Sequence, residues 1–299
     1  MSLRDWMIEV RAPFLLLPVI LSLVGSSLAL YNGHLDIVNV VLFTAVLVLL
    51  HITVNTLNEY YDHKTGIDAH TRRTIFNGGT GILQEGRLTP RQVLRAAVGC
   101  FVLAAVLSSY LVLKVGPALV PLVVLGMIFA LFYTQIFARN MLGEIAAGLG
   151  LGTLPVLGAY MVQIPVLSLG SVVLSLVAGI LTFNLLLLNE FPDLEADVQG
   201  GRRNIVIRLG TRRAAQLYTA LTFSVYGILS LFVAAGMLPP LSLLGLATIP
   251  FAYKAASVSF TDPRSTGSFV QGQKANVQVV LITQIFVAMG IVATVLLAP

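Results

Sequence analysis

The sequence predicts an all-α, polytopic membrane protein whose nine transmembrane helices surround a central cavity as two four-helix half-bundles plus one helix. Three observations predict this fold. Hydrophobic residues fill 57% of the 299 positions and charged residues only 10%, whereas soluble domains carry about a quarter charged residues. Apolar runs of about 20 residues, long enough to cross the hydrocarbon core as a helix, occur nine times. Segments of about 10 residues with alternating polarity, typical of membrane barrels, do not occur.

The nine apolar runs follow one another along a single domain that spans residues 1–299. The first run is longer than the apolar part of a signal peptide, so we expect it to be a membrane helix. The eighth run is the weakest, because Pro250 and Lys254 interrupt it. We predict helices at residues 13–31, 37–57, 93–115, 117–137, 141–162, 165–188, 214–236, 241–258 and 277–297.

Basic residues indicate how these helices are oriented. Of the 18 Lys and Arg residues, 17 fall in the N-terminal segment and the loops on the same side, and only Lys114 lies on the other side. Because cytoplasmic segments carry the excess of Lys and Arg, we expect a plasma-membrane protein with a cytoplasmic N-terminus and an external C-terminus. No basic segment interleaved with aromatic residues is present, so nucleic acid is not an expected partner.

Two short acidic motifs concentrate the carboxylates of the chain. Seven of the 13 acidic residues lie in two windows at the ends of apolar runs, where carboxylates are costly unless they bind cations or pair with bases. The first acidic motif comprises Asn58, Asp62 and Asp68, and the second comprises Asn189, Asp193 and Asp197. We expect the two longest loops, residues 59–92 and 190–213, to be the cytoplasmic catalytic loops.

The two windows also resemble each other. Each begins with Asn-Glu-x-x-Asp, and each carries a pair of arginines after its last aspartate. A duplicated half-bundle would bring the two loops face to face over a central cavity. The alternative, that both are ordinary basic cytoplasmic loops, explains the arginines but not the repeated Asn and Asp.

Helical periodicity places the residues of the first motif on one face. His51, Asn55, Asn58 and Asp62 are spaced by 4, 3 and 4 residues, so on a helix they form one polar stripe. Such a stripe should face the bundle interior or a wet cavity, because facing lipid would be costly. For His51 alone we favour a hydrogen bond to a neighbouring helix.

The second motif follows the same geometry. Its three residues advance by four, so their side chains share one helical face. Pro192 is expected to end or kink the apolar helix at this point. Glu195 points away from the shared face, so we expect its carboxylate to be solvated.

The ligand types in the two motifs point to a hard metal ion. Carboxylate and amide oxygens, without a cysteine or histidine cluster, suit Mg²⁺. Protein-bound Mg²⁺ is usually held by one or two carboxylates together with substrate phosphates, so the motifs predict a diphosphate bridged by metal ions. Arg72 and Arg73 can bind phosphate oxygens directly, and a glycine-rich turn at residues 76–81 offers backbone N–H groups to an anion.

At these residues the chain resembles the UbiA superfamily of intramembrane aromatic prenyltransferases. The marks are an Asn-x-x-x-Asp motif with a following Asp after the second helix, an Asp-x-x-x-Asp motif after the sixth helix, and nine helices. Two features are most similar to the dihydroxynaphthoate (menaquinone) branch and its vertebrate vitamin K relatives. They are the spacing from Asp62 to Asp68 and the stretch Arg203-Asn-Ile-Val-Ile-Arg-Leu-Gly210.

The resemblance implies a function and a site. It implies transfer of an isoprenyl group from a polyprenyl diphosphate to an aromatic quinone precursor within the bilayer. The two acidic motifs would together hold two Mg²⁺ ions, for which Mn²⁺ is an expected substitute. The catalytic aspartates would be Asp62, Asp68, Asp193 and Asp197. The substrate-binding residues would be Asn58, Asn189, Arg72, Arg73, Tyr133 and Arg139.

The chain departs from the family pattern at one element. The family has Tyr-x-x-x-Lys in the loop after the fourth helix, but Tyr133-Thr-Gln-Ile-Phe137 lacks the lysine. Arg139, two residues later, is the expected replacement. For Tyr133 an aromatic anchor at the membrane interface is an equal alternative.

Other functions compete with prenyl transfer. An ion-coupled transporter also places acids in the membrane, but near the midplane rather than at the cytoplasmic boundary. The CDP-alcohol phosphotransferases carry an Asp-Gly-x-x-Ala-Arg motif that this chain lacks. Within the superfamily, hydroxybenzoate, haem or a glycerol-phosphate lipid would be alternative acceptors. The candidates for a general base are Asp68, Glu59 and the acceptor's own ionisation.

The distribution of basic residues generates a prediction about topology. We expect the loops that contain Arg73 and Arg203 to be cytoplasmic and Pro299 to lie outside, because 17 of 18 basic residues lie on one side. Labelling of single engineered cysteines in intact cells checks this orientation. Both loops reacting with an impermeant reagent from outside would reverse it.

Overall fold

A computed structural model of the protein describes residues 2–67 and 74–297. Within these residues, nine helical segments are long and apolar enough to cross a membrane, which confirms the predicted number. The fifth span consists of two short helices, α6 and α7, joined by a π-helical turn at Leu149–Thr153. The helices are α1 (Leu3–Glu9), α2 (Leu16–Tyr31), α3 (Ile37–Thr65), α4 (Pro90–Val115), α5 (Val120–Phe132), α6 (Gly143–Gly148), α7 (Leu154–Met161), α8 (Leu169–Gln199), α9 (Ile205–Ala234), α10 (Ile249–Ser259) and α11 (Thr266–Leu297).

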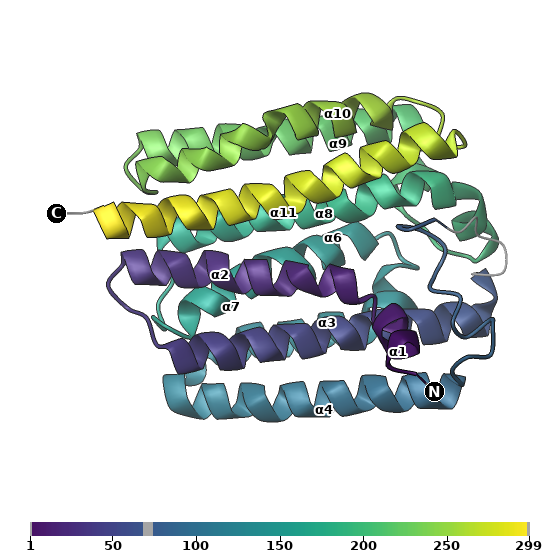
Figure 1. Ribbon diagram of the computed structural model, residues 1–299, viewed down its shortest axis with the longest axis horizontal. Coiled ribbons are helices and arrows are strands. Elements are labelled where there is room, and N and C mark those ends of the chain that lie inside the picture. Colours follow the sequence, from purple (N-terminus) through teal and green to yellow (C-terminus); the bar gives the residue numbers. More distant parts are fainter. Residues whose placement is uncertain (1, 68–73, 298–299) are drawn as a thin grey trace.

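The spanning helices run side by side, and the short helix α1 lies at one end of the bundle (Figure 1). α2 packs against α3, α7 and α11, while α8 packs against α6, α9 and α11. The last spanning helix, α11, therefore packs against the first, α2. α4 lies at one edge of the bundle, and α9 and α10 lie at the other. The helices between these edges include α2, α3, α8 and α11.

Local signals explain where several helices begin. Asp36 caps α3 by accepting hydrogen bonds from the backbone N–H groups of Val38 and Asn39. Thr89 and Ser168 form capping boxes before α4 and α8, and α4 also has proline at its first position. These side chains satisfy N–H groups that have no partner within the helix.

Two helices extend further than hydropathy indicates. α3 continues to Thr65 and ends at Gly66, which has a left-handed backbone (φ 76°). α8 continues through Pro192 to Gln199. The predicted loops, residues 59–92 and 190–213, therefore begin as helix rather than as loop. Pro192 does not end α8, because proline removes only one hydrogen bond of the helix and the turns on either side remain intact.

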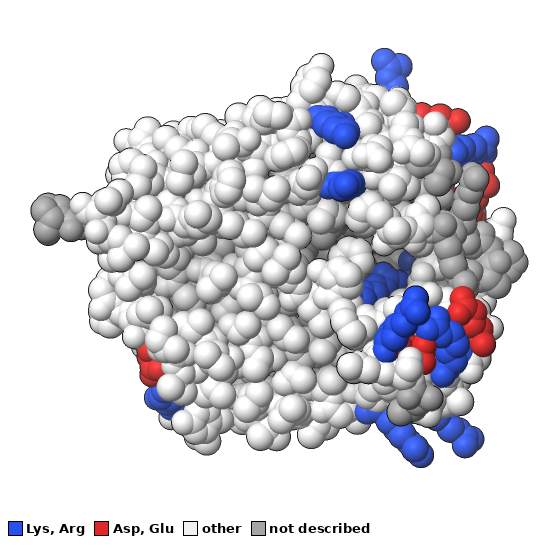
Figure 2. Space-filling view, viewed as in Figure 1, with Lys and Arg blue, Asp and Glu red and all other residues white. Residues whose placement is uncertain are grey.

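Charged side chains gather at one end of the bundle, where α3 and α8 terminate (Figures 1 and 2). At the opposite end, Lys114 at the end of α4 donates to Asp36 at the start of α3, with Nζ 2.8 Å from Oδ2. Most of the surface between the two ends carries no charge in the view of Figure 2. This distribution matches a bundle that crosses a hydrocarbon layer with one polar end.

Close packing between helices depends on glycines. A Cβ atom on Gly25 of α2 would lie 2.3 Å from the carbonyl oxygen of Val156, and one on Gly290 of α11 would lie 1.9 Å from that of Leu241. Neither distance is possible, so only glycine permits these backbones to approach so closely. Small residues at such contacts are the usual means by which helices associate in membranes.

Replacement of Gly290 by alanine should destabilise the protein by about 1–3 kcal/mol, because the added methyl group forces two backbones apart. Thermal unfolding in detergent measures the effect. Gly227→Ala on α9 is the matched control, since nothing lies within 4 Å of its Cβ position, and it should be neutral or slightly stabilising. Equal melting temperatures for the two variants would contradict the packing argument.

Candidate active site

A polar cavity of about 480 Å³ lies among α2, α3, α8 and α11, at the charged end of the bundle. Residues 75–79, which include the first part of the glycine-rich turn, and the connection after α8 complete its wall. The motif residues that line it are Asn58, Asp62, Asn189, Asp193 and Asp197. The described residues of the two acidic motifs, more than 120 residues apart in the chain, are thus brought to one cavity.

The polar stripe on α3 faces this cavity along its whole length. His51, Asn55, Asn58 and Asp62 all line it. Asn55 donates to the carbonyl oxygen of Val10 at 3.0 Å, which holds the N-terminal segment against the stripe. The predicted facing of the stripe toward a cavity is confirmed.

The second motif occupies one face of α8, as its four-residue spacing predicts. Asn189, Asp193 and Asp197 line the cavity, whereas Glu195 projects to the surface and pairs with Arg264. The side chain of Glu195 is 72% exposed, which confirms that its carboxylate is solvated.

Arg202 links the two motifs across the cavity. Its guanidinium donates to the carboxylate of Asp62 and, at 3.3 Å, to Oδ1 of Asp197. Burial opposes the charge of the guanidinium, but the two carboxylates outweigh that effect and raise the pKa of Arg202. Asn204 donates to the other oxygen of Asp197 at 2.9 Å. One cation therefore contacts both motifs at once.

A second set of hydrogen bonds joins α8, α11 and the glycine-rich turn. Asn77 donates to Oδ2 of Asp193 at 2.8 Å and to the carbonyl oxygen of Asn189 at 2.6 Å. Gln273 of α11, which is 1% exposed, donates to the side-chain oxygens of Asn77 and Asn189 at 2.6 and 3.0 Å. The side-chain amides of Asn77 and Gln273 thus orient Asn189 and Asp193 of the second motif.

The glycine-rich turn does bind an anion, but the anion belongs to the protein. The backbone N–H of Thr80 donates to both carboxylate oxygens of Glu59, at 3.1 and 3.0 Å. The Thr80 hydroxyl and the Arg11 guanidinium also donate to this carboxylate. Glycines at 78, 79 and 81 have positive φ angles, which allows the turn to wrap around the acid. Glu59 is consequently a structural anchor that holds the turn over the cavity.

The remaining predicted site residues fall into three groups. Asp68, Arg72 and Arg73 lie outside the described residues. Arg139 is exposed and does not line the cavity, because Ala138 faces the cavity and the next residue turns away from it. Tyr133 does line the cavity, so its ring faces the protein interior rather than the membrane interface.

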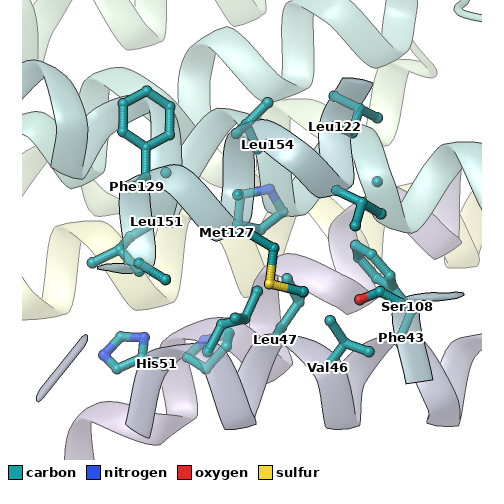
Figure 3. A pocket seen from close by; sticks show the side chains of 18 of the residues that line it. Phe43, Val46, Leu47, His51, Ser108, Leu122, Met127, Phe129, Leu151 and Leu154 are labelled. Atoms are coloured by element: carbon teal, nitrogen blue, oxygen red, sulfur yellow. The ribbon is translucent and has the colours of Figure 1, made fainter. Parts of the chain in front are cut away.

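A smaller apolar cavity of about 70 Å³ adjoins the polar one and is lined by residues of α2, α3, α5 and α7. Figure 3 shows His51 at one end, with Leu47, Val46 and Phe43 following along α3. Residues of α5 and α7, including Met127 and Leu154, form the opposite wall. The two cavities share four lining residues, His51, Val54, Tyr133 and Leu151, which we call the neck.

The donor set of the polar cavity fits a magnesium ion that substrate phosphates help to hold. Oδ1 of Asp193 is buried without a hydrogen-bond partner among the described residues, so it is available as a ligand. In residues 2–67 and 74–297, no three carboxyl, imidazole or thiol groups converge closely enough to form a metal site alone. Mg²⁺ commonly takes only one or two carboxylates and completes its shell with phosphates and water.

Some residues of the site were not predicted. Asn77 and Gln273 contact Asn189 of the second motif from 112 and 84 residues away in the chain, and separations of that size leave no local signal. Gln273 lies on the polar first turns of α11, which begins at Thr266 rather than at the predicted residue 277. Arg202 belongs to a recognised arginine pair, but the pattern alone does not show which arginine turns inward.

Comparisons with known proteins agree with this geometry. The sequence profile of the UbiA prenyltransferase family matches residues 16–296. A relative, 1,4-dihydroxy-2-naphthoate octaprenyltransferase of Bacillus subtilis (strain 168), is 29% identical over 66% of this chain and 63% of its own length. Two solved structures share the fold. A UbiA homologue from Aeropyrum pernix K1 has a TM-score of 0.70 at 17% identity, covering 93% of this chain and 98% of its own. One from Archaeoglobus fulgidus bound to GPP and Mg²⁺ has a TM-score of 0.66 at 11% identity, covering 97% and 99%.

The family profile covers nearly all of the membrane-spanning part, from the start of α2 to the end of α11. The fold of the solved neighbours agrees with the helical spans found in the described residues. The chain belongs to the UbiA prenyltransferase family.

Proposed function

We propose that the protein transfers an isoprenyl group from a polyprenyl diphosphate to an aromatic quinone precursor of the naphthoate type within the membrane. The observation that carries this proposal is that two cavities of different character adjoin each other. A cavity lined by Asn and Asp from two motifs shares four lining residues, the neck, with an apolar cavity. This shape matches a substrate with an anionic head and a hydrocarbon tail.

The diphosphate would lie between the two acidic motifs. Asp62, Asp193 and Asp197, with the amides of Asn58 and Asn189, line the part of the cavity that would hold the metal ions, and Asp68 would add a ligand. Two Mg²⁺ ions, or Mn²⁺ in their place, would neutralise the charge that develops on the departing diphosphate. Asp62, Asp68, Asp193 and Asp197 are the proposed catalytic aspartates.

Other side chains of this chain would bind and orient the substrates. Arg202 already bridges the two motifs and would contact a phosphate oxygen once the carboxylates turn to the metal ions. Arg72 and Arg73 would bind the diphosphate from the adjoining segment, and Tyr133 would contact the first isoprene unit at the neck. Arg139 would need to turn inward to take part.

The protein must also exclude water from the reacting atoms. An allylic cation reacts rapidly with water, so the ring of the acceptor must be the nearest nucleophile. The turn at residues 75–79 covers the polar cavity, and the buried Glu59 anchors that turn. The apolar cavity would hold the tail in a dry environment.

Known relatives support the choice of acceptor. The Bacillus subtilis protein is named a dihydroxynaphthoate octaprenyltransferase, and a solved neighbour in the fold is described as bound to GPP and Mg²⁺. The gathering of charge at one end of the bundle supports a cytoplasmic location for the N-terminus and for the segments 59–92 and 190–213. We assign the single domain, residues 1–299, to the plasma membrane on the same grounds.

Metal removal tests the proposed chemistry. Isoprenyl diphosphate should bind tightly only with Mg²⁺ or Mn²⁺, and EDTA should abolish turnover in a way that added metal reverses. Mass spectrometry of the prenylated product and calorimetric titration of the diphosphate give the two measurements. Prenyl transfer that persists undiminished after thorough chelation would exclude a metal-dependent mechanism.

Charge removal tests the proposed ligands. Asp62→Asn and Asp193→Asn keep size and hydrogen bonding but remove a charge, so each should lower turnover by about 10²-fold or more. Thermal stability of Asp193→Asn should be unchanged or raised, because clustered carboxylates repel one another in the absence of metal. Glu195→Gln, at the exposed surface, is the matched control and should be nearly neutral. Turnover of the Asp variants within a few-fold of the parent would refute the site.

A further inference from the structure

One residue of the neck between the two cavities is a buried histidine of α3. His51 is 6% exposed and lies in the membrane-spanning part of α3. No hydrogen bond or ion pair of its imidazole ring is found among the described residues, so the predicted hydrogen bond to a neighbouring helix is absent there. The imidazole lines both cavities, so a ligand in either of them can supply its hydrogen-bond partner.

The position of His51 places it beside the reacting atoms, an argument that rests on the proposed function. The diphosphate would lie at the level of the two motifs and the hydrocarbon tail in the apolar cavity. The bond between them, from C1 of the isoprenyl group to the bridging oxygen, would then lie close to the neck. His51 is seven residues before Asn58 on the same face of α3, about 10 Å along the helix axis.

The imidazole is the proton acceptor that lines both cavities, whereas Glu190, a carboxylate near Tyr133, lines only the polar one. Arg11, at the N-terminus of the turn before α2, interacts electrostatically with His51, and Tyr133 lines the neck beside it. Glu59, a candidate base on sequence grounds, is bound by Thr80 and Arg11 through both its oxygens. Asp62, Asp193 and Asp197 are assigned to the metal ions. A neutral imidazole accepts a proton through one nitrogen while the other donates.

We propose that His51 is a catalytic residue, which binds the hydroxyl group of the aromatic acceptor at the neck and accepts its proton during prenyl transfer. The C1–O bond of the isoprenyl diphosphate breaks, and its electron pair leaves with the diphosphate. A π-electron pair of the ring forms the new C–C bond to C1. The hydroxyl oxygen becomes a ring carbonyl as its proton moves to the imidazole nitrogen, which gives a prenylated dienone with the same net charge as the acceptor, and an imidazolium.

Two substitutions test this role in the full-length protein in nanodiscs, with Mg²⁺, an isoprenyl diphosphate and a dihydroxynaphthoate. His51→Gln keeps a hydrogen-bonding side chain that cannot accept the proton, and His51→Leu removes the polar group. We expect kcat of His51→Gln to fall by about 10²-fold or more, with the acceptor KM nearly unchanged. The Kd of a non-hydrolysable isoprenyl diphosphate analogue should stay within about twofold of the parent for both variants, since His51 does not contact the diphosphate.

An acceptor with a more acidic hydroxyl group distinguishes a role of His51 in proton transfer from a role in packing. On a ring with electron-withdrawing substituents, the hydroxyl is already ionised at the assay pH and needs no base. The ratio of parent to His51→Gln turnover should therefore shrink to a few-fold on this acceptor. A structural role would give the same ratio on both acceptors, and that result would overturn the proposal, as would a His51→Gln enzyme with parental turnover.

A matched control comes from α11. Gln284 is also a buried polar residue of a spanning helix, 2% exposed, and lies outside both cavities, so Gln284→Leu should keep parental kcat. If His51→Leu does not fold, His51→Gln alone decides the question. A parent enzyme that prenylates no hydroxylated aromatic compound would refute the proposed function itself, whereas an active parent with an indifferent His51 would refute only this inference.

Discussion

A carboxylate at the edge of a membrane must meet a positive charge or several hydrogen-bond donors, and the polar end of this protein is built around that requirement. Glu59 meets Arg11 and the N–H of Thr80, while Asp62 and Asp197 share Arg202. The pairings of Glu59 with Arg11 and of Asp62 with Arg202 join residues that are 48 and 140 positions apart in sequence. The N-terminal segment, the glycine-rich turn and the connection after α8 therefore take their positions from the acids they neutralise.

The spans were predictable because length and hydropathy translate directly into membrane crossing. The shared faces of the two motifs were predictable for a similar reason, since a period of 3.6 residues is a property of the helix itself. The ends of α3 and α8 were not. Hydropathy falls at Asn58 and Asn189, but the helical hydrogen bonds continue because the polar side chains face a cavity rather than lipid.

The site could be predicted only in its local part. The carboxylates and amides of the two motifs can be recognised from their composition and spacing, but the residues that orient them cannot. Gln273 reaches Asn77 and Asn189 from the other end of the chain, and its role depends entirely on how α11 packs beside α8. Arg139 shows another limit of local pattern: it lies two residues beyond the position of the family's lysine, and the spacing does not show that a π-helical segment, Tyr133–Phe137, precedes it or that it lies on the exposed side.

The extension of α3 beyond its apolar part also determines how the two substrates meet. At 29 residues, α3 is about 43 Å long, whereas the hydrocarbon core is about 30 Å thick. The polar cavity at its end therefore lies at the boundary between lipid and water. Under the proposed function, a long-chain diphosphate would arrive by lateral diffusion within one leaflet, while a soluble acceptor would arrive from the bulk. Saturation of the site by the diphosphate would then depend on its mole fraction among the lipids, so an expanding membrane would dilute this substrate even at constant cellular content.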